Sequence, residues 1–213
     1  MTLPGAVVAA IAPMLIYPIF VYWMDRFEKE PLVLIGAAFL WGLVPAAALS
    51  LLTQAAIGAP FLLLDSTGRL ADVAVAVAVA PLSEEFFKAI ALLMLFLIWR
   101  DEFDGVFDGV IYGSLVGFGF AAIENILYFL DADSSLVFSR SVLFGLNHAL
   151  YTSLTGIGFG VARLARSRPL RFLAPAVGLM AAVALHALHN TVLLLSADAP
   201  GLFWAAVLID WTG

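Results

Sequence analysis

The stretch LPGAVVAAIAPMLIYPIFVYWM, residues 3–24, contains no charged residue. As an α-helix it would be about 33 Å long, at ~1.5 Å per residue, which is enough to cross a hydrocarbon core of ~30 Å. A cleaved signal peptide has a basic start and an apolar core of only about 7–15 residues, whereas this chain begins MTLP. The stretch therefore predicts a retained membrane-spanning helix.

Apolar runs of similar length continue along the chain. Hydrophobic residues make up 63% of the sequence and charged residues 12%, against roughly 45–50% and about 25% in soluble domains. We predict an all-α fold: a polytopic transmembrane helix bundle of six to eight helices, forming a single integral membrane domain over residues 1–213. Besides residues 3–24, the predicted spans are residues 32–58, 71–99, 105–130, 135–162 and 172–196. We predict a short, half-inserted helix at residues 201–211 and a loop at residues 59–70.

Composition also excludes several functional classes. The chain has no cysteine, which removes disulfides, iron–sulfur clusters, thiolate zinc sites and cysteine nucleophiles. Ten Lys and Arg against 16 Asp and Glu argue against nucleic acid as a partner. Any catalysis within the lipid bilayer must therefore use carboxylate, imidazole, hydroxyl or amine groups.

The basic residues predict the orientation, because Lys and Arg in short loops resist translocation. With the N-terminus outside, the cytoplasmic flanks hold Arg26, Lys29, Arg100, Arg163, Arg166, Arg168 and Arg171, and the outer flanks hold Arg69 and Arg140. This asymmetry predicts a multi-pass protein of the cell membrane with its N-terminus outside.

Five ionisable residues inside the predicted spans are candidates for function: Glu84, Glu85, Glu124, His148 and His186. A charge near the bilayer centre costs about 2.5–3.5 kcal/mol on insertion scales, so such residues face the bundle interior and usually serve function. In the predicted topology all five fall in the middle or outer half of the membrane. We therefore expect one site buried between four helices.

The adjacent glutamates predict a division of roles. Lys88 follows Glu84 by four residues and Glu85 by three, so its ammonium group can neutralise one carboxylate on the same helix. The other carboxylate is then free to act as a general base, with Lys88 and Asn190 as supporting groups. An ion-paired clamp without catalytic function would give the same pattern.

The remaining candidates suit a metal. Two imidazoles and one carboxylate form an established ligand set of catalytic zinc, which leaves a fourth position for water. Glu124, His148 and His186 provide this set. We therefore expect a divalent metal, and these ligand types favour zinc. Asn125 follows Glu124 and predicts a supporting hydrogen bond between helices.

Taken in order, these motifs resemble the PrsW family of intramembrane proteases, which is related to the CAAX prenyl protease and Abi superfamily. The similar segments are residues 84–88 (EEFFK), residues 120–125 (FAAIEN), Asn147 and His148 with Thr152, and His186 with Asn190. The related superfamily has histidine where this chain has Glu124. His189 departs from the family pattern, and we assign it no catalytic role.

The resemblance implies an intramembrane endopeptidase, a hydrolase that cleaves single-pass membrane proteins such as an anti-sigma factor on their extracytoplasmic side. Three alternatives stay open. In a metal-free protease, Glu84 and Glu124 would activate water while His148 and Asn190 stabilise the oxyanion. A proton- or cation-coupled transporter also uses buried Glu, Lys and His, but the inverted repeats typical of transporters are not visible. A noncatalytic membrane protein could bind peptides in a polar groove.

Overall fold

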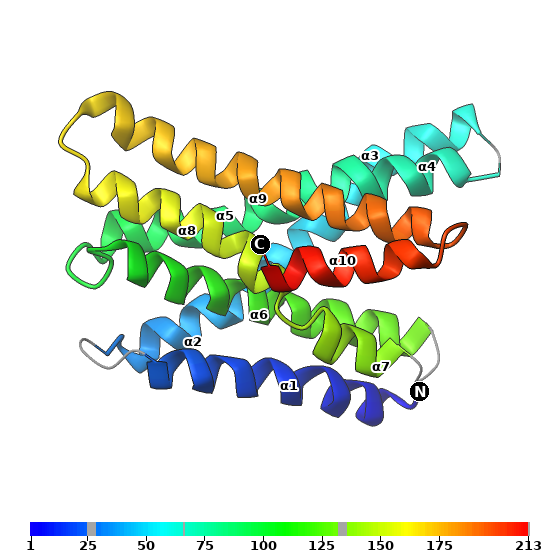
Figure 1. Ribbon diagram of the computed structural model, residues 1–213, viewed down its shortest axis with the longest axis horizontal. Coiled ribbons are helices and arrows are strands. Elements are labelled where there is room, and N and C mark those ends of the chain that lie inside the picture. The colour runs from blue at the N-terminus through cyan, green and yellow to red at the C-terminus, as the bar shows by residue number, and fades with distance from the viewer. Residues whose placement is uncertain (25–28, 66, 132–135, 213) are drawn as a thin grey trace.

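The computed structural model describes residues 1–24, 29–65, 67–131 and 136–212, and these residues form helices and no strand (Figure 1). The helices are α1 (Leu3–Met24), α2 (Leu32–Trp41), α3 (Ala47–Leu64), α4 (Arg69–Ala74), α5 (Ala80–Ile98), α6 (Val106–Asp131), α7 (Leu136–Phe138), α8 (Asn147–Leu164), α9 (Arg168–Ser196) and α10 (Gly201–Thr212). Three π-helical segments join some of them: η1 (Gly42–Ala46), η2 (Val75–Val79) and η3 (Ser139–Leu143). The predicted all-α class is confirmed. Arg26 and the predicted start of the fifth span, Ser135, lie outside the described residues.

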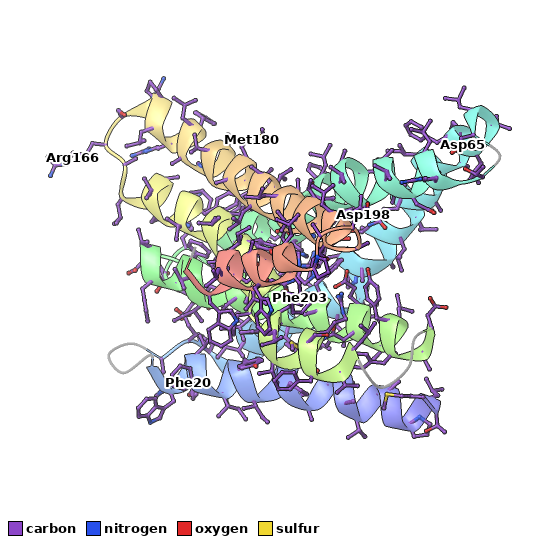
Figure 2. All side chains as sticks on the ribbon, turned by 45° about the vertical axis from the view of Figure 1, so that its right-hand side comes forward. Phe20, Asp65, Arg166, Met180, Asp198 and Phe203 are labelled. Carbon is purple, nitrogen blue, oxygen red and sulfur yellow. The ribbon has the colours of Figure 1, made fainter. Side chains whose placement is uncertain are left out.

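The surface of the bundle has the character of a membrane protein. Residues 3–23, 32–64, 106–131 and 168–196 are long and apolar enough to cross a bilayer. Large apolar side chains point outward along these helices, as Phe20 and Met180 do in Figure 2, with exposed fractions of 56% and 64%. Such side chains are favourable in contact with lipid, and the protein is a multi-pass helical membrane protein.

The second span is longer than the sequence predicts. α2, η1 and α3 follow one another without a break from Leu32 to Leu64, so residues 59–64 of the predicted loop are helical, and α4 begins at Arg69. Asp65 ends the helix, because its carboxylate accepts hydrogen bonds from Thr67 and from the Leu70 amide. The hydrogen bond from the Thr67 hydroxyl holds the pKa of Asp65 below its ordinary value. Gly68 then turns the chain with φ of 78°, a conformation that favours glycine.

The third span carries the irregularity that its proline predicts. α4, η2 and α5 are continuous from Arg69 to Ile98, and the wide π turn directly precedes Pro81 in the first turn of α5. Proline has no N–H, so a carbonyl one turn earlier loses its helical partner. Asn190 of α9 donates a hydrogen bond to the Ala76 carbonyl in η2, at 2.8 Å. A side chain of α9 thus stabilises the irregular turn that leads into the EEFFK motif.

The fifth predicted span, residues 135–162, is interrupted. α7 and η3 end at Leu143, and α8 begins at Asn147. A Cβ atom at Gly145 would collide with the Ser141 carbonyl, so this tight connection favours glycine. His148 therefore lies in the first turn of α8, instead of in the middle of a long helix.

The close packing of α6 against α8 fixes two candidate residues relative to each other. A Cβ atom at Gly117 would collide with the His148 carbonyl, and one at Gly113 would approach Ser153 Cα to 2.8 Å. Small residues allow membrane helices to approach backbone to backbone. This contact places His148 beside the second half of α6, where Glu124 lies.

The connections gather at the two ends of the bundle. In Figure 1, the turns at residues 99–105 and 165–167 lie at one end, and the N-terminus and the turn between α9 and α10 lie at the other. α10 then runs back beside α9 toward the middle of the bundle (Figure 1). With 12 residues it is about 18 Å long, shorter than a hydrocarbon core of ~30 Å.

Candidate active site

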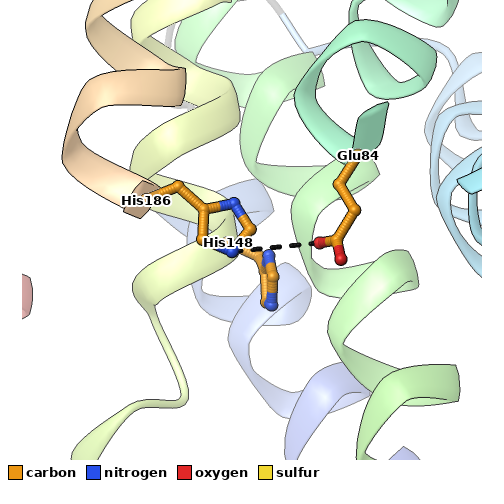
Figure 3. A group of neighbouring side chains, drawn as sticks. All are labelled: Glu84, His148 and His186. Atoms are coloured by element: carbon orange, nitrogen blue, oxygen red, sulfur yellow. Dashed lines mark ion pairs between the residues drawn. The ribbon is translucent and has the colours of Figure 1, made fainter. Parts of the chain in front are cut away.

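The five ionisable candidates from the sequence meet in one buried cluster. α5 contributes Glu84 and Glu85, α6 contributes Glu124, α8 contributes His148 and α9 contributes His186. Figure 3 shows Glu84 pointing toward the two histidines from the opposite helix. The juxtaposition of the five residues agrees with the expectation of one site between four helices.

Glu85 is a fully partnered carboxylate. Its Oε1 atom accepts a hydrogen bond from Lys88 Nζ at 2.8 Å and lies 3.1 Å from His186 Nδ1. Its Oε2 atom accepts a hydrogen bond from the Thr152 hydroxyl at 3.0 Å. Glu85 and Lys88 are both completely buried. Glu85 is therefore the glutamate that the lysine neutralises.

Glu84 is held less tightly. Its Oε1 atom accepts a hydrogen bond from Gln54 Nε2 at 3.1 Å. Its Oε2 atom lies 3.8 Å from Lys88 Nζ and 3.9 Å from His186 Nε2, and it has no hydrogen-bond partner among the described residues. The side chain is 7% exposed. Of the two glutamates, Glu84 is the one with an oxygen left for chemistry.

The contacts of His148 fix its tautomer. Lys88 Nζ lies 2.8 Å from His148 Nδ1, and an ammonium group can only donate, so Nδ1 is the acceptor. The ring proton of the neutral imidazole is then on Nε2, which faces Glu124 Oε2 at 2.9 Å. Lys88 also lies over the Phe120 ring, 3.9 Å from its centroid. His148 is thus oriented from both sides by charged residues.

Glu124 has a second partner that carries a full positive charge. Arg140 of η3 pairs with Glu124 Oε2 through Nη2 and donates from Nε to Asn125 Oδ1 at 2.8 Å. The guanidinium group also lies over the ring of Tyr128, 3.7 Å from its centroid. Asn125 therefore makes the supporting hydrogen bond that the sequence predicts, and its partner is Arg140.

Three residues of the cluster form a potential metal-binding group. Glu84, His148 and His186 each offer one ligand atom, and these atoms all lie within 4.8 Å of one another (Figure 3). Glu124, predicted from the sequence as the carboxylate ligand, contacts His148 but is also paired with Arg140. Asn190 lies at the same cavity and is anchored to η2.

A cavity of about 1060 Å³ opens onto this cluster. Ser50 and Gln54 of α3 line it on one side, and Leu127 of α6 and Leu193 of α9 line it on others. Glu84, Glu124, His148 and His186 are also among its lining residues. The volume is at the upper end of that of small-molecule pockets and can hold a short peptide segment.

Four residues in or beside the cluster were not predicted from the sequence to belong to the site. Gln54, Arg140 and Tyr151 contact its members directly, and Asp210 contacts Tyr151. Gln54 and Asp210 are isolated polar or charged residues within apolar stretches, and this isolation is the signal that could have identified them. Arg140 carries the same signal, but its predicted role was only that of a basic residue in the outer flank. Tyr151 carries no such signal, because a tyrosine in an apolar helix is common at membrane interfaces.

The comparisons with known proteins identify the family that the chain resembles. The family described as PrsW family intramembrane metalloprotease matches residues 30–212. Protease PrsW of Geobacillus kaustophilus is 32% identical over 158 residues, which are 74% of this chain and 66% of that protein. Protease PrsW of Oceanobacillus iheyensis is 32% identical over 195 residues, 87% of this chain and 81% of that protein.

A further relative extends the same similarity. Protease PrsW of Bacillus subtilis is 28% identical over 166 residues, which are 75% of this chain and 70% of that protein. No solved structure significantly matches the chain. The family match covers α2 to α10 and includes the whole polar cluster. The chain therefore belongs to the PrsW family of intramembrane proteases.

Proposed function

We propose that this protein hydrolyses peptide bonds in single-pass, membrane-anchored proteins. The observation that carries the proposal is a cavity of about 1060 Å³ that ends on glutamate and histidine side chains inside a largely apolar bundle. Ionisable groups inside a membrane protein are costly and are retained mainly for function. Membership in the PrsW family supports proteolysis as that function.

Glu84 is the proposed general base. It lines the cavity and has an oxygen without a hydrogen-bond partner, whereas both oxygens of Glu85 have partners. As water attacks the peptide carbonyl carbon, its proton passes to Glu84, and the new C–O bond forms. Glu84 then gives the proton to the leaving amine as the C–N bond breaks. Lys88, 3.8 Å away, balances the negative charge of this carboxylate.

His148 and Asn190 are proposed to stabilise the oxyanion. His148 carries its proton on Nε2, where Glu124 Oε2 accepts it in the structure and a substrate oxyanion would take the place of that acceptor. Asn190 has one amide N–H beyond the bond that it donates to Ala76. Both residues line the cavity, so both can reach a substrate carbonyl there. Donors that are already oriented before reaction are worth about 2.7–4 kcal/mol each to the transition state in other hydrolases.

As an alternative arrangement of the same residues, we propose a divalent metal, with zinc favoured by the donor atoms. Glu84 and His148 would then be metal ligands in place of general base and oxyanion donor, and His148 Nε2 would have to give up its proton. Glu84, His148 and His186 fit this group, since they combine two imidazoles with a carboxylate, and Glu84 Oε2 is a buried oxygen without a partner. When bound, zinc would polarise the carbonyl and activate water. Glu124, the ligand expected from the sequence, would have to exchange Arg140 for the metal. The metal content of Glu84→Gln and Glu124→Gln protein therefore distinguishes the two carboxylates.

The proposed orientation has the N-terminus outside the cell membrane and the turn at residues 165–167 in the cytoplasm. Arg163, Arg166, Arg168 and Arg171 flank that turn, which supports this orientation. An anti-sigma factor is the proposed type of substrate, because the family resemblance implies a single-pass protein cut on its extracytoplasmic side.

The test is cleavage by purified protein in proteoliposomes. A single-pass substrate with tags at both ends is co-reconstituted, and mass spectrometry locates the cut. We expect one main product pair, with the cut in the membrane-embedded segment or directly outside it. An unfolded water-soluble protein, added as control, is expected to stay intact. Cleavage of the soluble protein alone, or of neither protein, would contradict the proposed function.

A further inference from the structure

Tyr151 packs against both active-site histidines. It lies on α8 one turn after His148 and is completely buried. Its ring is stacked on the His186 imidazole, with centroids 5.0 Å apart and an interplanar angle of 25°. It also contacts His148 edge to face, at 6.0 Å. The orientation of Tyr151 therefore restrains the ring of His186.

Asp210 of α10 fixes the other end of Tyr151. The Tyr151 hydroxyl donates a hydrogen bond to Asp210 Oδ1 at 2.7 Å. Asp210 is the single charged residue of α10 and is only 5% exposed. A carboxylate in a membrane helix is costly to insert, so α10 would insert more readily with an apolar residue here. This cost indicates that the Asp210 carboxylate has a functional role at this position.

The third histidine of the chain lies beside the same carboxylate. His189 Nδ1 is 3.0 Å from Asp210 Oδ2, although the orientation is not that of a hydrogen bond. The His189 ring packs edge to face on Phe144, at 5.0 Å, in the connection between η3 and α8. Phe144 in turn contacts Phe203 of α10 at 5.4 Å. α10 thus contacts α8, α9 and the break that precedes His148.

We propose that α10 is a positioning element of the active site: Asp210 holds the Tyr151 hydroxyl, and the Tyr151 ring holds the His186 imidazole. Asp210 does not line the cavity, so it acts through Tyr151 and not on the substrate. This inference rests on the proposed proteolytic function for its activity readout. A helix too short to cross the bilayer thereby contributes to catalysis from behind the histidines.

The first test is kinetic and uses the proteoliposome assay. Outer partners that orient a functional histidine typically contribute 10–100-fold to metal affinity or activity. We expect Asp210→Ala and Tyr151→Phe each to lower kcat about 10-fold or more, with KM within about twofold of the wild type. Asp210→Asn should retain most activity, because its amide oxygen still accepts the Tyr151 hydrogen bond. Asp198→Asn, at an exposed position before α10, is the matched control and should be unchanged.

A double-mutant cycle separates positioning from simple stabilisation. If Asp210 acts through the Tyr151 hydroxyl, the Tyr151→Phe/Asp210→Ala protein has the kcat of either single variant. The proposal would be overturned if the reduction of kcat in the double variant were the product of the two single reductions. It would also be overturned by an Asp210→Ala protein with the kcat of the wild type. Asp210→Asn and Tyr151→Phe preserve the shapes of the side chains. If Asp210→Ala protein does not insert into the membrane, the kcat values of these two variants are compared instead.

The second test does not depend on activity. The chain has three histidines, so the ¹⁵N NMR signals of labelled protein in nanodiscs can be assigned by substituting each histidine in turn. We expect the His186 signals to shift or broaden in Tyr151→Phe protein and to stay unchanged in Asp198→Asn protein. Unchanged His186 signals in Tyr151→Phe would overturn the positioning role even in active protein. If the His186 signals shift in Tyr151→Phe protein but the wild-type protein cleaves no substrate, the positioning role is supported and the proposed proteolytic function is contradicted.

Discussion

Glu84 Oε2 on α5 lies 3.9 Å from His186 Nε2 on α9, and this oxygen has no hydrogen-bond partner among the described residues. The neighbouring Glu85 has the opposite character, with Lys88, Thr152 and His186 all within 3.1 Å of its oxygens. One helix therefore presents a carboxylate with one unpartnered oxygen and a fully partnered carboxylate to the His186 imidazole.

Glu85→Gln should reduce both stability and cleavage. The substitution leaves the buried Lys88 ammonium without its 2.8 Å partner, and breaking a buried pair of this kind costs about 3–5 kcal/mol. Glu84→Gln should change stability by less, because Lys88 lies 3.8 Å from that carboxylate. Thermal unfolding in detergent measures both. Equal midpoints for the two variants would contradict the assignment of Glu85 as the bound carboxylate.

Gly117→Ala should loosen the contact between α6 and α8. The added Cβ atom would collide with the His148 carbonyl, and overpacking of this kind typically costs about 1–3 kcal/mol. Because His148 moves with its backbone, cleavage should fall as well. Gly36→Ala is the matched control, since its Cβ atom would have no neighbour within 4 Å. A Gly117→Ala protein as stable and active as Gly36→Ala would show that the close approach is not required.

Single cysteines should report the orientation in the membrane. The chain has no cysteine of its own, so Ser167→Cys and Asp198→Cys each introduce one reactive thiol, at opposite ends of the bundle. With the N-terminus outside, a membrane-impermeant thiol reagent should label position 198 in intact cells and position 167 only after lysis. The reverse pattern of labelling would reverse the proposed topology.

Removal of metal should abolish cleavage if the proposed zinc is required. Exhaustive treatment with 1,10-phenanthroline should inactivate the protein, and added zinc should restore activity. Elemental analysis should find close to one metal per chain in active protein and much less in a His148→Ala/His186→Ala protein. Full activity after chelation, with little metal in the active protein, would favour a mechanism that uses Glu84 without a metal.

The sequence predicts the helical membrane fold well, because spans are recognised from local apolar runs. α1 matches residues 3–24, and α6 lies within one residue of the predicted 105–130. The break before His148 was not predicted, since residues 144–146 contain no proline or charge, and a single glycine is common in membrane helices. The tight packing that requires Gly145 is a property of the folded chain.

The sequence predicts which residues form the candidate site better than it predicts which of them contact one another. Ionisable residues in apolar spans identify Glu84, Glu124 and His186, because lipid excludes them from the outside of the bundle. Which carboxylate remains free depends on differences of about one ångström between helices, such as 2.8 Å against 3.8 Å from Lys88. Arg140 and Asp210 complete the network from other helical segments, 16 residues after Glu124 and 59 residues after Tyr151, and a single sequence does not identify these pairs.

The most direct measurement of the central claim is the cleavage rate of Glu84→Gln protein in proteoliposomes with a single-pass substrate. The substitution preserves the size of the side chain and removes the base. We predict that the rate falls by about 10²–10⁴-fold while the amount of folded protein is unchanged. Glu102→Gln, the same exchange at the end of the bundle, should keep the wild-type rate. A Glu84→Gln protein that cleaves as fast as Glu102→Gln would contradict the account.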